Sequence, residues 1–248
     1  MSREMSKPVS DLPGAVQAAC RELREGLLRV LGHDLVGLWV YGAVTFEDRP
    51  RRLGDVDAHA VVRAPIGPER ARAIDELHAS SDVEWDSWYV LLADVASPAP
   101  PRHAFRAGLH DRAWALHRAH WLAGQYVLLH GRTPAELVPA PTWPELLEGL
   151  RSEVEFVERV VREGARDAEH AAFAVWNGCR VIYSLRTRDV VVSKRAAATW
   201  ALEHAPPSWR PAIEAAGRAY DAQPRPGDAE TLRAAAGIVA AAARDALG

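Results

Sequence analysis

The stretch that decides the fold reads LVGLWVY at residues 35–41, then Gly42, a polar loop, and DVDAHAVV at residues 55–62. The first segment is a short, continuous apolar run rich in branched and aromatic residues, which predicts a buried strand. The loop contains proline and glycine, which favour a turn over regular structure. The second segment predicts another strand, and it begins with the pattern Asp-x-Asp.

The two aspartates of this pattern carry the first chemical prediction. Residues two apart in a strand point to the same face, so Asp55 and Asp57 should project together while Val56 and Ala58 enter the core. Two neighbouring carboxylates repel each other, and a hard divalent cation relieves that repulsion. Magnesium prefers such oxygen ligands and keeps positions for water and phosphate oxygens. We therefore expect a magnesium site at Asp55 and Asp57.

A third predicted strand covers residues 83–95 and adds further acids. Glu84 and Asp86 are two apart and share a face, so one of them can join the aspartate pair if the two strands are neighbours. A third carboxylate there could bind metal or accept a proton from an attacking hydroxyl. Ordinary surface acids at strand ends are the competing interpretation. The order of strand, glycine, loop, Asp-x-Asp strand and acidic strand favours the metal site.

Other candidate groups give weaker signals. His59 should share the face of Asp57 and could be a ligand or a proton relay, but a solvent-exposed or structural histidine is the favoured interpretation. The ten histidines show no spacing typical of zinc enzymes. Cys20 and Cys179 lie at helix-like apolar positions, so no disulfide framework is expected.

The rest of the chain predicts two domains. Residues 1–142 should form an α+β domain with a mixed sheet and flanking helices, and residues 143–248 a helical bundle. A proline-rich segment separates them. Helical periodicity predicts a helix after residue 13 and others at 68–80 and 111–125, and, in the second domain, at 145–163, 169–185, 194–204, 206–222 and 229–246.

Composition narrows the class of protein. The 248 residues are 48% hydrophobic and 25% charged, with a formal net charge of -3. Such a chain can bury a real core, and its charge does not indicate a dedicated nucleic-acid binder. No apolar run approaches the roughly 18 residues of a membrane span, and the first residues lack the apolar core of a signal peptide. We expect a cytoplasmic monomer that binds neither membrane nor nucleic acid.

The strand, glycine, loop and Asp-x-Asp pattern resembles the nucleotidyltransferase superfamily. Two later segments narrow the resemblance: VLLHGRTPAELVPAPTWPELLEGL at 127–150, and CRVIYSLRTRDVVVSKRAAATWALEHAPPSWRPAIEAA at 179–216. Both resemble the helical domain of the streptomycin and spectinomycin (aminoglycoside) adenylyltransferases. The resemblance covers residues 35–222. Its most specific motifs are R-x-x-Y-S and S-K-x-x-A-x-x-W-A.

The resemblance implies an activity and roles for the carboxylates. Members of this family transfer AMP from ATP to a hydroxyl of an aminocyclitol antibiotic. By position, Asp55 and Asp57 would hold Mg²⁺, and Asp86 would complete the metal carboxylates and match the catalytic base. The family has glutamate at this last position, so the shorter aspartate reaches less far, and Glu84 is an alternative on the same face.

The resemblance also assigns nucleotide contacts. Gly42 and Ala43 would form the turn that approaches the triphosphate, where glycine allows close backbone contact. Arg180 and Lys194 match basic positions near the nucleotide, although a surface arginine and a first-turn helix lysine are equally good interpretations.

Several positions depart from the family pattern. Ala43 replaces a serine that would contact phosphate, and Gly54 replaces a small polar residue. His170 stands where the family has an acid used for streptomycin, and Phe173 replaces its polar partner, so streptomycin recognition is not expected. The acceptor should still be a small, polyhydroxylated, cationic molecule. The alternative is a catalytically inactive relative that binds a nucleotide or a partner protein.

Overall fold

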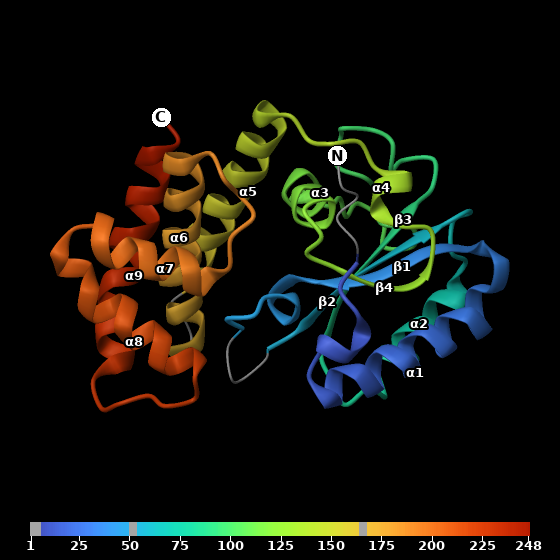
Figure 1. The fold of residues 1–248 in the computed structure, drawn as a ribbon, viewed down its shortest axis with the longest axis horizontal. Coiled ribbons are helices and arrows are strands. Elements are labelled where there is room, and N and C mark those ends of the chain that lie inside the picture. The colour runs from blue at the N-terminus through green and yellow to red at the C-terminus, as the bar shows by residue number, and fades with distance from the viewer. Residues whose placement is uncertain (1–5, 50–53, 164–167) are drawn as a thin grey trace. The chain divides into compact units, whose positions relative to one another are not determined.

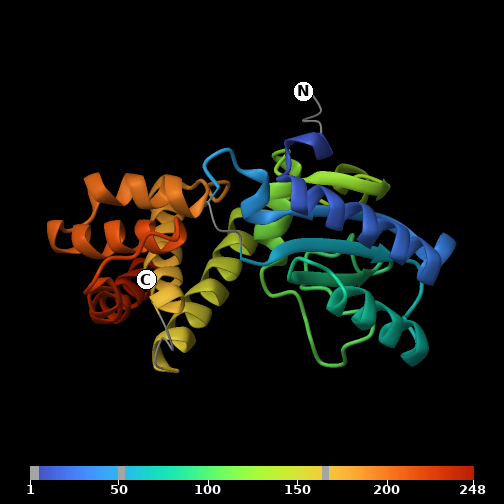
Figure 2. The same ribbon diagram turned by 90° about the horizontal axis from the view of Figure 1, so that it is seen from below.

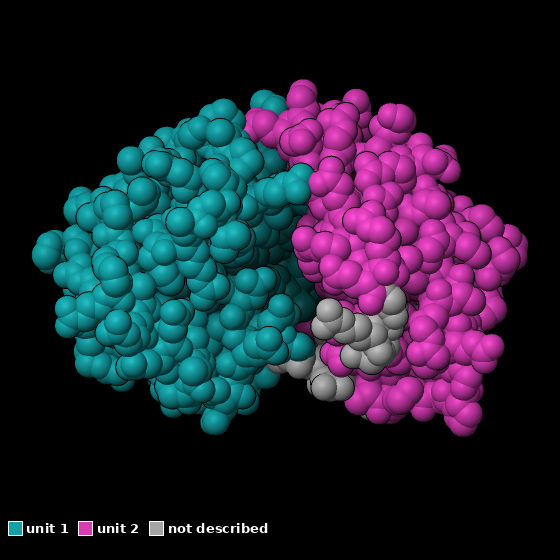
Figure 3. All heavy atoms as spheres, turned by 180° about the vertical axis from the view of Figure 1, so that it is seen from behind, with its two compact units in different colours: residues 1–47, 53–142 teal, residues 48–52, 143–248 magenta. Residues whose placement is uncertain are grey.

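The computed structural model describes residues 6–49, 54–163 and 168–248. The chain divides into two units, the first made of residues 1–47 and 53–142 and the second of residues 48–52 and 143–248 (Figure 3). The first unit contains a mixed sheet with helices, and the second is helical, so the predicted fold class is confirmed.

The sheet has four strands in the order β3-β2-β1-β4. They are β1 (Leu35–Tyr41), β2 (Val56–Val62), β3 (Trp85–Leu91) and β4 (Val127–Gly131). β1 pairs antiparallel with both β2 and β4, whereas β2 and β3 are parallel. β4 is a strand that the sequence analysis did not predict. Its five residues are too few to show a clear alternation of apolar and polar side chains, and the strand is formed by hydrogen bonding to β1.

Helices cover both faces of the sheet (Figure 1; Figure 2). They are α1 (Gly14–Leu31) and α2 (Pro68–Ala79) on one face, and α3 (Trp114–Leu122) and α4 (Pro134–Leu137) on the other. Successive side chains of β1 point to opposite faces of the sheet and enter two separate hydrophobic cores. Leu38 and Val40 pack with α1 and α2, while Trp39 and Tyr41 pack with Trp114 of α3. β1 is therefore buried on both sides, which explains its continuous apolar sequence.

Two predicted elements are shorter in the structure. The third strand ends at Leu91 because its parallel partner β2 ends at Val62, directly opposite. The helix predicted from residue 111 begins at Trp114. Asp111 lies before it, where its carboxylate accepts the backbone N–H of Ala113 at 3.1 Å. That local hydrogen bond replaces the predicted first turn.

The second unit consists of five main helices: α5 (Trp143–Arg162), α6 (Ala168–Thr187), α7 (Lys194–His204), α8 (Arg210–Tyr220) and α9 (Asp228–Ala246). Helix α6 lies at the centre and packs against the other four. Ser193 caps α7, since its hydroxyl accepts the N–H of Ala196 at 2.9 Å. Trp176 stacks on Tyr220 with ring centroids 4.5 Å apart. Within the described ranges, no helix is long and apolar enough to cross a membrane.

Candidate functional site

The site begins at the turn after β1. Gly42 has φ +74°, and a Cβ atom built there would lie only 1.7 Å from Oδ2 of Asp57. The hydroxyl of Thr45 donates to the carbonyl of Gly42 at 2.8 Å and fixes the turn. Glycine is required here because an L residue would be strained at this φ and would overlap the carboxylate. The turn and the Asp-x-Asp strand are therefore built against each other.

The predicted carboxylates lie along neighbouring strands. Asp57 faces Tyr41 on one side and Asp86 on the other in the strand register. Asp55 precedes β2 and is exposed, whereas Val56 and Ala58 are buried as predicted. Asp57 is half-buried, and Asp86 is exposed. The parallel pairing of β2 and β3 thus places Asp57 beside Asp86.

Electrostatics show that these acids share one region. Burial raises the pKa of Tyr41 well above its ordinary value, and the charges of Asp57, Asp111, Asp86 and Asp55 raise it further, in that order. The pKa of Asp86 is also raised, first by partial desolvation at the strand edge and next by the charge of Asp55. Four carboxylates therefore act on one tyrosine, and a bound cation would relieve their repulsion.

Oxygen donors of this kind suit magnesium. Asp57 and Asp86, adjacent in the register, and Asp55, whose charge acts on Asp86, are the residues that would hold it. The carboxylate of Asp57 occupies the space that a side chain at residue 42 would fill, so the turn and this carboxylate are packed together. The donor chemistry fits the ion, and the assignment of Asp55, Asp57 and Asp86 as ligands stays a prediction.

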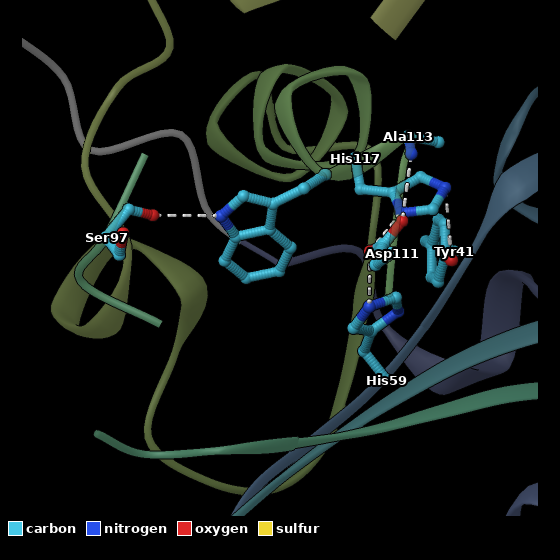
Figure 4. Close-up of polar contacts among 7 residues, drawn as sticks. Tyr41, His59, Ser97, Asp111, Ala113 and His117 are labelled. Carbon is cyan, nitrogen blue, oxygen red and sulfur yellow. Dashed lines mark hydrogen bonds and ion pairs between the residues drawn. The ribbon is translucent and has the colours of Figure 1, made fainter. Parts of the chain in front are cut away.

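A second cluster lies beside the first and was only partly expected (Figure 4). Oδ2 of Asp111 lies 3.1 Å from Nε2 of His59 and 2.9 Å from Nδ1 of His117. Nε2 of His117 lies 3.5 Å from the hydroxyl of Tyr41. The three ligand atoms lie within 4.8 Å of one another, so the group could hold a metal ion. The carboxylates Asp55, Asp57 and Asp86 do not form so tight a group.

The sequence signal for this cluster was incomplete. His59 was considered because it lies two residues after Asp57, but Asp111 and His117 were read only as parts of a helix. Their six-residue separation matches no common ligand spacing. Only the fold brings β2, the segment before α3 and α3 itself together. Burial lowers the pKa of His59 to about 4, and contacts with His117 and His59 hold the pKa of Asp111 well below its ordinary value despite its burial.

The predicted basic residues lie in the second unit. Arg180 contacts Glu153, with Nη2 2.9 Å from Oε2, and the same oxygen accepts the side-chain amide of Asn177. Lys194 is the first residue of α7, and its ammonium lies 4.2 Å from the ring centroid of Phe173. Both residues have protein contacts of their own, and their predicted contact with phosphate stays a prediction.

Comparison with known proteins gives two findings. Residues 145–242 match the family model described as aminoglycoside adenylyltransferase, C-terminal domain. The structure also resembles the crystal structure of spectinomycin adenyltransferase AAD(9) from Enterococcus faecialis with ATP and spectinomycin. That match has a TM-score of 0.70 at 14% identity, and covers 93% of this chain and 98% of the other. No curated protein sequence gives a significant match.

The fold of the described chain is that of the AAD(9) structure, with a mixed sheet followed by a helical region. Residues 145–242, within the helical region, resemble the C-terminal domain of the aminoglycoside adenylyltransferases. The resemblance found in the sequence is therefore confirmed.

Proposed function

We propose that this protein is a magnesium-dependent nucleotidyltransferase that transfers AMP from ATP to a hydroxyl of a small aminocyclitol-like molecule. The observation that carries the proposal is the turn at Gly42, which is built around the carboxylate of Asp57 beside Asp86. The family match and the likeness to a structure that contains ATP and spectinomycin support the same chemistry.

In this mechanism Asp55 and Asp57, with Asp86, would hold the magnesium that accompanies ATP. The ion would neutralise phosphate charge and relieve the repulsion among these carboxylates. The chain's own residues position the reactants, which is the main source of rate in phosphoryl-type transfer. Gly42 and Ala43 form the turn proposed to face the triphosphate. Arg180 and Lys194 would neutralise phosphate charge.

Asp86 is proposed as the general base. The acceptor hydroxyl gives its proton to the carboxylate of Asp86, its oxygen bonds to the α-phosphorus of ATP, and the bond to pyrophosphate breaks. Asp86 lies opposite Asp57 in the register of β2 and β3, next to the proposed metal ligands. Its exposure leaves it accessible to a hydroxyl.

Spectinomycin is the first acceptor to test. The relative with the same fold is a spectinomycin adenyltransferase. In this chain the ring of Phe173 contacts the ring of Phe156 and the ammonium of Lys194, and His170 lies three residues earlier on α6. An apolar ring and a histidine replace the acid and polar partner expected for streptomycin, so we expect little transfer to streptomycin.

The test combines binding and transfer. Calorimetry should detect ATP binding by the wild type only with magnesium, and Asp57→Asn should abolish it. Glu76→Gln is the matched control, because Glu76 is an exposed acid on α2 that has no proposed role. Transfer is then followed by pyrophosphate release with spectinomycin. Absence of nucleotide binding in the wild type would refute the proposal.

An inactive relative is the second candidate. Ala43 is exposed in the turn and lacks the hydroxyl that the family uses on phosphate. Magnesium-dependent ATP binding without pyrophosphate release, across a panel of aminocyclitols, would favour this reading.

A further inference from the structure

A second metal site is suggested by the cluster of His59, Asp111 and His117 in the first unit. His59 comes from β2, His117 from α3, and Asp111 from the segment before α3. The side chains of His59 and Asp111 are 0% and 2% exposed, and that of His117 is 20% exposed. The cluster is therefore shielded from water but reachable through His117.

Two of the ligand-atom pairs lie slightly closer together than the ligands of a tetrahedral ion. With metal–ligand bonds of about 2.0–2.2 Å, adjacent ligand atoms of such a site lie about 3.3–3.6 Å apart. Here Oδ2 of Asp111 lies 3.1 Å from one imidazole nitrogen and 2.9 Å from the other. All three ligand atoms lie within 4.8 Å of one another. Shifts of a few tenths of an ångström would seat an ion.

Outer contacts orient two of the three donors, whereas Nδ1 of His59 is buried without a hydrogen-bond partner among the described residues. Oδ1 of Asp111 accepts the N–H of Ala113 at 3.1 Å, which leaves Oδ2 directed at the two histidines. The other ring nitrogen of His117 lies 3.5 Å from the hydroxyl of Tyr41. Hydrogen bonds from ligands to such outer groups fix ring orientation and tautomer. When an ion binds, the ring proton of His117 moves from Nδ1 to Nε2, where the oxygen of Tyr41 can accept it.

The chemistry of the three ligand atoms and the charge around them indicate which kind of ion the cluster would bind. Two imidazoles and one carboxylate suit a borderline transition metal, whereas magnesium prefers oxygen alone. Three protein ligands with a fourth position open are typical of zinc sites. The charges of Asp55, Asp57 and Asp86 also act on Tyr41 and favour a cation nearby.

We propose that His59, Asp111 and His117 bind a Zn²⁺-class ion, distinct from the magnesium at Asp55, Asp57 and Asp86. The ion would link β2 to α3 and so hold α3 against the face of the sheet that carries Trp39 and Tyr41. This site does not depend on the proposed transferase function. Its competitor is a cluster held by hydrogen bonds alone.

The test uses the full chain, stripped of metal and titrated with Zn²⁺ and Co²⁺. We expect one ion per chain, intense visible absorption of tetrahedral Co²⁺, and a higher melting temperature with Zn²⁺, since binding to the folded state alone stabilises it. Excess Mg²⁺ should not displace the ion. No Co²⁺ band and no saturable Zn²⁺ binding in the wild type would overturn the proposal in favour of the hydrogen-bonded cluster.

Variants locate the ion. His117→Gln should weaken Zn²⁺ binding by at least about 100-fold, and Tyr41→Phe by about tenfold, the scale of an outer-contact change. His33→Gln is the matched control, because the side chain of His33 is 92% exposed. Loss of binding in the control, or unchanged binding in His117→Gln, would contradict the assignment.

Further variants separate this site from the proposed magnesium site. Asp57→Asn should keep Zn²⁺ binding and lose magnesium-dependent ATP binding. If ATP binding fails in the wild type while Zn²⁺ binds, the transferase proposal fails and the metal site stands. Asp111→Asn provides a second ligand variant if His117→Gln does not fold.

Discussion

The two units of this protein place their acidic side chains differently. In the helical unit, partly buried acids lie next to arginines: Nη2 of Arg218 lies 2.6 Å from Oδ1 of Asp228, and Nη2 of Arg195 lies 2.6 Å from Oδ1 of Asp221. In the sheet unit, the charge of Asp55 raises the pKa of Asp86, and Asp57 lies opposite Asp86 in the strand register. Acids paired with arginines indicate a structural role, whereas acids gathered in one region indicate a candidate cation site.

The sharpest test of this difference is Asp86→Asn. If the carboxylate accepts the acceptor's proton, the transfer rate falls by about 100- to 10,000-fold, the usual contribution of a general base. The variant should fold normally, because Asp86 is exposed. Steady-state transfer to the tested aminocyclitol measures the effect, with Glu76→Gln as the control and Glu84→Gln as the test of the alternative base. An Asp86→Asn enzyme as fast as the wild type would remove Asp86 from the mechanism.

Gly42→Ala tests the turn that shapes the sheet unit. The new methyl would collide with the carboxylate of Asp57 at a residue with φ +74°. We expect loss of magnesium-dependent ATP binding and a stability loss of about 1–3 kcal/mol from backbone strain. Calorimetry and urea unfolding measure the two effects. Gly54→Ala, where a methyl meets nothing within 4 Å, should leave both unchanged.

Two glycines in the helical unit give a matched pair in which only packing differs. In α6, a methyl on Gly178 would lie 2.5 Å from Cγ1 of Val239, whose side chain is fully buried. Gly178→Ala should destabilise the unit by about 1–3 kcal/mol through overpacking. In α9, a methyl on Gly237 meets its nearest atom at 3.8 Å.

Gly237→Ala should therefore stabilise the protein by about 0.5–1 kcal/mol, because glycine costs this much inside a helix. Urea unfolding followed by circular dichroism measures both variants. Equal shifts in the two would show that α6 and α9 pack less tightly than the structure indicates.

The smallest expected effect concerns acid stability of the helical unit. The hydrogen bond from Arg218 lowers the pKa of Asp228 to about 2, from an ordinary value near 3.8. A lowered folded-state pKa stabilises the fold above the ordinary value, and this contribution is lost as the pH falls from about 4 to about 2. Asp228→Asn should thus be less stable than the wild type at pH 6, with a gap that narrows toward pH 2.

Urea unfolding at both pH values checks this, and Arg218→Gln should behave in the same way. A gap that stays constant with pH would mean that the pair adds no pH-dependent stability.

Helices were the best-predicted part of the molecule. The five helices of the second unit lie within a few residues of their predicted bounds because 3.6-residue periodicity is a local signal. The strand β4 was missed, and β3 was predicted too long. Strand length depends on the partner, and the partner is not adjacent in sequence.

The sequence by itself determined the fold class, the family resemblance and the strand that carries Asp57, which in the structure begins just after Asp55. These depend on local periodicity and on short motifs. The tertiary structure decided that Gly42 makes room for Asp57, that Asp86 is its neighbour, and that Asp111 and His117 join His59. These residues are far apart in the sequence, by 58 positions for His59 and His117, and only the folded chain brings them close together.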